Sequence, residues 1–297
     1  MEQLQYIIDL YRDADPAVMA AVERYFLENG PEPLALLKSQ YHAEMDPSRK
    51  AVLADMLGRF NKKQVIRSLR QIASQCACGG EMCMLDAGYL MATLTDATLR
   101  RIDYMESMIP PTVAVMTEIS DSRTGIENVN LLNHIFYEKY GFSARNPFDM
   151  SLEGTLLMKV LEIRHGSPFA LSLLYFIIAQ TAGLPVYPLC FTGGFVPVYM
   201  ENDKILFNIN VFHKGEIFIE NDIGNMVSKQ AASLGVNVDV GEAKVRKDQS
   251  ILIMYLEYLQ MLYSNNGDSA AQMDIDDAIE ALGGKRFLTV EEDDDNW

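Results

Sequence analysis

The stretch Gly166-Ser167-Pro168-Phe169-Ala170-Leu171-Ser172-Leu173-Leu174-Tyr175 decides the fold of this chain. Proline is favoured at the first position of a helix, because an N–H group there would have no partner within the helix. Gly-Ser-Pro therefore predicts a helix start, and apolar residues follow almost without interruption. Ala182-Gly183-Leu184-Pro185 ends the run, since glycine favours a helix end and proline cannot continue the ladder.

After Leu184 the pattern changes from helix to strand. Three short runs, 186–191, 195–200 and 204–209, are rich in β-forming residues and are separated by glycines or by Glu201-Asn202-Asp203. Their connections are too short for a crossover, so we expect an antiparallel meander. A fourth short run, 215–219, precedes a return to helix, and the apolar residues there predict helices over 248–263 and 270–282.

The first seventy or so residues predict paired helices. Asp15-Pro16 and Asp46-Pro47 lie 31 residues apart, and in each pair the aspartate can cap a helix whose first residue is the proline. Each unit adds a second helix, over 33–40 and 62–74. This arrangement is similar to two HEAT-type repeats, which need neighbours to bury their apolar faces.

Between this array and the central helix we expect further helices. An apolar helix covers 82–95, and the stretch Thr95-Asp96 restarts a helix that Pro110-Pro111 ends, because neither proline can donate to a helical ladder. Helices over 113–118 and 125–140 follow.

Composition limits the possible partners and the compartment. The 297 residues have a net charge of −16 and no basic cluster interleaved with aromatic residues, so nucleic acid is not an expected partner. The N-terminus lacks a signal peptide, and the longest apolar segment, 169–178, is too short to cross a bilayer. We therefore expect a cytoplasmic protein with reduced thiols, no membrane contact and no cofactor.

The central segment resembles the SirB-like branch of the transglutaminase-like superfamily. The motifs that carry this resemblance, in order, are Leu132-Asn133-His134-Ile135-Phe136-Tyr137-Glu138 with Gly141-Phe142, Leu161 to Pro168, Phe191-Thr192-Gly193-Gly194-Phe195 and Val211-Phe212-His213-Lys214-Gly215. Members of this branch also carry helical repeats before the core and tetratricopeptide-like helices after it. The resemblance implies a mostly helical α+β protein with a core of the papain-like cysteine protease type, a small antiparallel sheet and flanking helical repeats.

The resemblance also indicates where catalytic residues would lie. Transglutaminase-like enzymes place a Cys at the helix start, where the helix dipole and a His lower its pKa, and an Asp orients the His. Those three positions correspond to Pro168, Gly194 and Asn210. The SirB-like branch usually has Pro at the first position but commonly keeps the His and the Asp. This chain therefore lacks all three catalytic residues.

A cleft without the triad can still bind. We expect free amides after Pro168, and Asn210 can donate and accept hydrogen bonds, so a carboxylate, amide or peptide is a reasonable ligand. The expected groove lies between Pro168, Gly194 and Asn210. Arg164 could bind an anion near the helix start, and His165 could add a donor. Alternatively, Arg164 pairs with Glu162 or Glu153, and His165 faces solvent. The expected function is a catalytically degenerate module that binds protein or peptide.

The alternative is a thiol-dependent amide hydrolase or acyl transferase. It would use Cys190 as the nucleophile, His213 as the base and Asn210 as the orienting group. Against it stands the observation that a Cys in a strand is more often a small buried apolar residue.

A metal site is a further alternative. Cys76, Cys78 and Cys83 provide three soft ligands at short spacing, with Glu81 as a fourth. No second Cys/His pair lies nearby in sequence, so incidental thiols in a loop and a helix start are the simpler interpretation.

The expected organisation has four parts: a HEAT-like array over 1–78, a transglutaminase-like core over 79–240, a helical hairpin over 241–285 and an acidic tail over 286–297. The tail is expected to be a solvated, disordered segment, with a docking peptide anchored by Trp297 as the alternative. The oligomeric state stays open.

Overall fold

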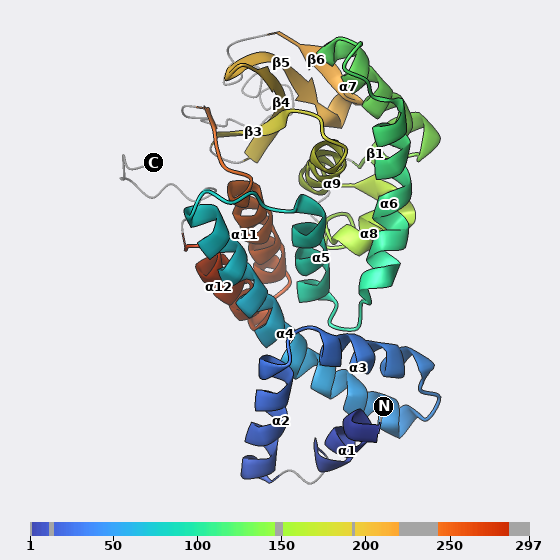
Figure 1. Ribbon diagram of the computed structural model, residues 1–297, viewed down its shortest axis with the longest axis vertical. Coiled ribbons are helices and arrows are strands. Elements are labelled where there is room, and N and C mark those ends of the chain that lie inside the picture. Colours follow the sequence, from blue (N-terminus) through green and yellow to red (C-terminus); the bar gives the residue numbers. More distant parts are fainter. Residues whose placement is uncertain (1, 12–14, 146–150, 192–193, 220–242, 285–297) are drawn as a thin grey trace.

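The computed structural model describes residues 2–11, 15–145, 151–191, 194–219 and 243–284. It confirms a mostly helical α+β architecture with small sheets (Figure 1). The acidic tail lies outside the described residues. Among the described helices, none is long and apolar enough to cross a membrane.

Four helices form the N-terminal part. Aspartate caps begin two of them as expected, because Asp15 accepts hydrogen bonds from two amides of α2 and Asp46 from two amides of α4. Their apolar faces form a separate cluster in which Phe26 stacks on Phe60 with ring centroids 4.7 Å apart. The bounds are Glu2–Tyr11 for α1, Pro16–Glu28 for α2, Glu32–Ala43 for α3 and Pro47–Ala77 for α4.

The expected second pair of helices is wrong, because α4 is one continuous helix of 31 residues. The sequence between 57 and 65 contains one glycine and no proline, so nothing forces the chain to turn there. Asn61 is buried at this point and donates to the carbonyl of Thr93 over 2.7 Å. One half of α4 thus packs in the N-terminal cluster and the other half in the main core.

The next two helices are α5 (Met84–Thr95) and α6 (Arg101–Glu118). Both ends of α6 differ from the prediction. Asp96 does not cap α6, because its carboxylate accepts from the amide and hydroxyl of Thr98 at 2.9 and 2.6 Å. Nor do Pro110 and Pro111 end the helix. They remove two donors, but Pro111 is buried and so held in the helix by packing, while the Thr112 hydroxyl donates to Met108 O at 2.7 Å. The expected helix over 113–118 is therefore the end of α6.

Two short parallel strands lead into the central helix. α7 (Gly125–Asn133) continues as the π-helix η1 (His134–Lys139), which matches the expected helix over 125–140. β1 (Ser143–Ala144) then pairs with β2 (His165–Gly166), and α8 (Leu157–Ile163) lies between them in sequence.

The central helix α9 (Pro168–Thr181) forms as predicted, from the Ser167 cap to Gly183, whose φ is +89°. Figure 1 shows it end-on in the middle of the larger body. It contacts α5, α6 and α8 and also the first strands of the sheet. Nine of its side chains are buried. The helix is apolar all round because other elements surround it.

The larger sheet confirms the antiparallel meander. Its order is β6-β5-β4-β3-β7, with every pairing antiparallel. Only β7, which pairs with β3, was not expected. The bounds are Val186–Phe191 for β3, Gly194–Glu201 for β4, Lys204–Asn210 for β5, Glu216–Phe218 for β6 and Lys244–Val245 for β7, with a 3-10 turn η2 at Val211–His213.

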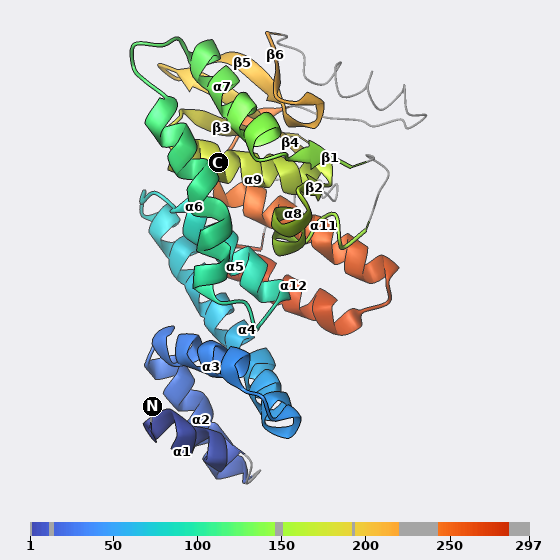
Figure 2. The ribbon, with the colours of Figure 1, turned by 90° about the vertical axis from the view of Figure 1, so that its right-hand side faces the viewer.

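The two predicted C-terminal helices are present as α11 (Gln249–Asn265) and α12 (Ser269–Ala281), which pack against each other as a hairpin. α11 is buried in the main core beneath α9, and α12 lies along α4 (Figure 2). Lys62 of α4 pairs with Asp274 and Asp277 of α12 at 2.5 and 2.9 Å. The hairpin therefore joins the N-terminal helices to the core.

Candidate functional site

The start of α9 is closed by its own side chains. Ser167 is buried, and its hydroxyl accepts from the amide of Ala170 at 3.3 Å, while its carbonyl accepts from Leu171 at 3.0 Å. Pro168 has no N–H, so at most the amide of Phe169 remains. The expectation of several free amides here is therefore wrong, because the serine cap uses them.

Phe169 fills the space beside Pro168. Its ring stacks on Tyr258 of α11, with centroids 5.3 Å apart, and meets Phe195 of β4 edge to face at 5.6 Å. Gly194 begins β4 nearby, and a Cβ at that position would touch the rings of Phe191 and Phe169 at 3.5 and 3.9 Å. The structure thus brings Gly194 to the start of α9, and its surroundings are aromatic.

Asn210 ends β5 and holds the turn that follows. Its Oδ1 accepts from the amide of His213 at 3.2 Å, and its Nδ2 lies 3.1 Å from His213 Nδ1. This turn, η2, contacts both α9 and β1. The expected contact between Asn210 and His213 is therefore present, on an exposed surface rather than in a closed cleft.

Arg164 pairs with neither Glu162 nor Glu153, the two carboxylates that the sequence suggested. Glu153 bonds to Arg145 at 3.2 Å and Glu162 to Lys159 at 2.9 Å, so neither carboxylate pairs with Arg164. Its guanidinium lies over the Phe142 ring, 4.7 Å from the centroid. Within the described residues, its buried Nη1 has no hydrogen-bond partner, and burial lowers its pKa.

His165 follows directly and is exposed, as the simpler alternative expected. It is not free, because its Nδ1 hydrogen-bonds to the hydroxyl of Ser143 across the β1–β2 pair. Arg164 itself has φ of +61°, a left-handed conformation at the end of α8 that starts this strand pair.

Beside these residues lies a hollow of about 420 Å³, which we call the sheet-edge hollow. It is bordered by η1, by β1 and by the turn into β6. Phe142 and Ser143, the partners of Arg164 and His165, both line it. Its lining includes Asn133, Phe142, Ser143, Lys214, Gly215 and Glu216.

Cys190 lies elsewhere. It is 2% exposed in β3, and burial raises the pKa of its thiol to about 12. β4 separates β3 from β5, so two inter-strand spacings, roughly 10 Å, lie between β3 and the strand that ends at Asn210. Among the described residues, no hydrogen bond joins Cys190 to His213. The structure therefore does not bring this thiol and this imidazole together.

The other three thiols lie near the loop between α4 and α5. Cys76 and Cys83 line a hollow of about 920 Å³ with Glu81 and Asp248. All four cysteines are free. In the part of the chain that the structure describes, no three His, Cys, Asp or Glu side chains are placed to hold a metal ion.

Comparison with models of known protein families identifies the family of this chain. A family model described as the transglutaminase-like superfamily matches residues 99–253, more than half of the chain. The chain belongs to the transglutaminase-like superfamily. The superfamily segment includes Pro168, Gly194 and Asn210, and it extends from before α6 into α11. No curated protein and no solved structure matched.

Sequence reasoning missed two features outside the superfamily positions. Lys38 is a buried lysine on α3, and its signal was its place on an apolar stripe with Leu34 and Leu37. Asp248 is a largely buried carboxyl at the start of α11, bonded to Gln180 at 3.3 Å. Burial raises its pKa to about 6. The sequence predicted it only as the first residue of the helix over 248–263.

Proposed function

We propose that this chain is a catalytically degenerate member of the SirB-like branch of the superfamily and acts in the cytoplasm as a module that binds protein or peptide. The observation that carries the proposal is the start of α9, where Pro168 supplies no nucleophile. The Ser167 hydroxyl is buried and accepts the helix amide of Ala170, so it is not placed to attack a ligand.

The sheet-edge hollow is the proposed peptide site. β6 is the last strand on its side of the described sheet and pairs there only with β5. An extended peptide can add to such an edge through main-chain hydrogen bonds. Lys214 on the turn into β6 is exposed, and Glu216 beside it supplies the opposite charge.

Arg164 supports an acidic ligand. Its guanidinium lies on Phe142, which lines the hollow, and no ion pair with a described carboxylate neutralises it. Arginine in this state binds carboxylates well, because its planar group offers several donors in a fixed geometry. Arg164 is thus a cation beside the hollow, whose own lining carries Lys214 together with Glu138 and Glu216. We expect Arg164 to pair with an acidic side chain of an extended peptide.

A second surface supports a protein partner. On α6, Ile102, Ile109, Val113 and Met116 are all between 45 and 56% exposed. Their spacing of seven, four and three residues places them along one face of the helix. An exposed apolar face of this kind is typical of interaction surfaces.

Selection from a phage-displayed library of short random peptides tests the proposal. We expect the purified chain to enrich extended acidic peptides, whose affinity is then measured by fluorescence anisotropy. Arg164→Gln and Lys214→Glu should each weaken binding about tenfold, a loss of ~1.4 kcal/mol. Lys204→Glu, an equally exposed position at the far end of β5, is the matched control.

Three results would count against the proposal. If no peptide is enriched, the proposed binding function is wrong. If the protein cleaves a bound peptide, it is not catalytically degenerate. If the Ile109→Lys variant binds the selected peptides more weakly but the Lys214→Glu variant binds them normally, the peptide site lies on α6 and not at the sheet-edge hollow.

A further inference from the structure

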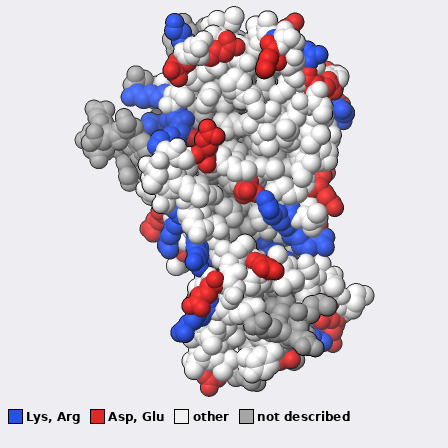
Figure 3. Space-filling model, in the orientation of Figure 1, with Lys and Arg blue, Asp and Glu red and all other residues white. Residues whose placement is uncertain are grey.

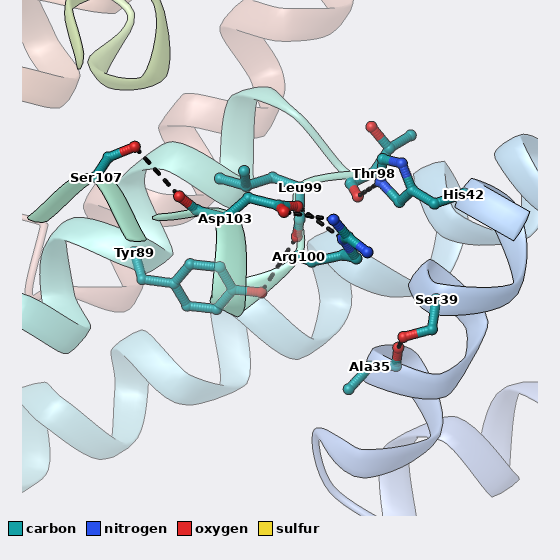
Figure 4. A network of polar contacts seen from close by, with 9 residues as sticks. All are labelled: Ala35, Ser39, His42, Tyr89, Thr98, Leu99, Arg100, Asp103 and Ser107. Atoms are coloured by element: carbon teal, nitrogen blue, oxygen red, sulfur yellow. Dashed lines mark hydrogen bonds and ion pairs between the residues drawn. The ribbon is translucent and has the colours of Figure 1, made fainter. Parts of the chain in front are cut away.

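A pocket of about 330 Å³ lies where the N-terminal helices meet the larger body. We call it the junction pocket. α3 and α4 form one side, and α5 and the start of α6 form the other, and His42 Nε2 lies 3.0 Å from the Thr98 carbonyl across the boundary (Figure 4). Its lining includes Lys38, Tyr89, Thr93, Arg100, Arg101 and Ile102.

Lys38 is the central group of this pocket. It is 3% exposed, and its ammonium donates to the Thr93 hydroxyl at 2.7 Å and to the Tyr89 hydroxyl at 3.2 Å. Each hydroxyl donates its own hydrogen bond to another acceptor: Thr93 donates to Asn61 Oδ1 at 3.2 Å, and Tyr89 donates to the Leu99 carbonyl at 3.3 Å. Both therefore act as acceptors toward Lys38. Its third N–H has no partner among the described residues.

The nearby carboxylates are engaged with other groups. Asp103 binds Arg100 through two hydrogen bonds at 2.8 and 2.5 Å. Asp86 pairs with Arg101. Asp96 accepts from Thr98 and attracts Lys38 only at longer range. A buried charge without a counter-ion is costly, so this lysine favours an anion from outside.

The start of α6 adds main-chain N–H groups, and the one carboxylate in its first turn, Asp103, is paired with Arg100. This helix has 18 residues, and the side chain of its N-cap residue, Arg100, makes no capping hydrogen bond. Helix N-terminal amides carry partial positive charge and favour anions. Figure 3 shows Lys and Arg side chains gathered near the junction of the N-terminal helices with the body. Figure 4 shows Arg100 and Tyr89 extending toward α3.

Leu34, Val65, Leu90 and Ile102 supply the apolar part of the remaining wall. Polar side chains also line it, among them Ser39, Ser68 and Gln64, whose buried Oε1 has no partner within the described residues. A ligand of this pocket therefore needs one anionic group and an apolar body, and the volume suits a small molecule or the end of a peptide. We propose that the junction pocket binds a carboxylate that carries an apolar group, with the Lys38 ammonium and the amides at the start of α6 receiving the carboxylate. This site is separate from the sheet-edge hollow, and its test does not depend on the proposed function.

Isothermal titration calorimetry with phenylacetate and phenylacetamide tests the inference. We expect phenylacetate to bind and its uncharged amide to bind at least about tenfold more weakly, because only the anion compensates the buried ammonium. A peptide with a C-terminal phenylalanine carboxylate and its amidated form make up a second arm. Binding in that arm alone identifies a chain terminus as the source of the carboxylate. Failure of both carboxylates, or equal binding of acid and amide, overturns the proposal.

Variants locate the binding. Lys38→Met should lower the affinity for the carboxylate at least about tenfold, and Lys50→Met, a lysine on α4 over the Tyr41 ring, should leave it unchanged. Ile102→Glu places a negative charge at the pocket rim on an exposed position and should also weaken binding. Its control is Ile126→Glu, a similarly exposed isoleucine at the start of α7. Unchanged binding in Lys38→Met and Ile102→Glu would refute the site.

Discussion

Gly215 lies directly against Asn133. The Asn133 Nδ2 donates to the Gly215 carbonyl at 2.8 Å, and Tyr175 of α9 donates to the Asn133 Oδ1 at 2.7 Å. These bonds tie the turn before β6 to α7 and to the central helix. This part of the wall of the sheet-edge hollow therefore depends on a close contact between Gly215 and Asn133, which leaves no room for a side chain at position 215.

Gly215→Ala should destabilise the protein strongly. A Cβ there would lie 1.9 Å from Asn133 Oδ1, and φ is +72°. We expect a loss of about 2–4 kcal/mol in the free energy of unfolding, measured by urea denaturation. Gly141→Ala is the control, since its φ is +73° but nothing lies within 4 Å, so about 1–2 kcal/mol is expected. Equal losses would mean that the contact with Asn133 contributes nothing.

Lys38 should make stability depend on pH in the alkaline range. Burial lowers its pKa from 10.5 to about 8, so between these values the unfolded chain binds more protons than the folded one. Stability from this group therefore rises with pH across that window, by roughly 3 kcal/mol at most. Lys38→Met removes the penalty, so it should be more stable than the wild type near pH 7, and the difference should shrink toward pH 10. A difference that is constant with pH would contradict the assignment.

Asp248 should destabilise the protein at neutral pH. Burial raises its pKa from 3.8 to about 6, so the folded state binds more protons than the unfolded state between these values, and stability falls as pH rises through them. Asp248→Asn keeps an acceptor for Gln180 and should raise the free energy of unfolding by about 1–2 kcal/mol at pH 7, discounted for partial exposure. Near pH 3 the effect should vanish. Asp121→Asn, at an exposed position, is the control and should change little at either pH.

Cys190 should be inert in the folded protein. Its burial and raised pKa leave almost no thiolate at neutral pH, whereas Cys78 and Cys83 are exposed. Ellman's reagent should label the exposed thiols first and Cys190 only after unfolding in urea. Cys190→Ser should lower the total in urea by one thiol and leave rapid native labelling unchanged. Stoichiometric native labelling of Cys190 that His213→Ala abolishes would instead support the thiol-dependent enzyme.

Local signals predicted most of the elements. The caps at Asp15 and Asp46 and the stretch from Ser167 to Gly183 act through hydrogen bonds within a few residues, so the sequence alone determined where those helices begin or end. The β-forming runs after Leu184 and their short connections likewise predicted the antiparallel meander. The motifs from Leu132 to Gly215 also identified the superfamily.

Tertiary contacts decided the rest. Pro110 and Pro111 remain inside α6 because packing holds a helix that their missing amides would locally weaken. Cys190 and His213 look like partners in the sequence, but β4 lies between β3, which contains Cys190, and β5, which leads into the turn that contains His213. The pKa of Lys38 is lowered only because the fold buries its side chain against Tyr89 and Thr93 of α5. Strand order and the partners of a buried side chain depend on residues far apart in the chain, so local patterns do not determine them.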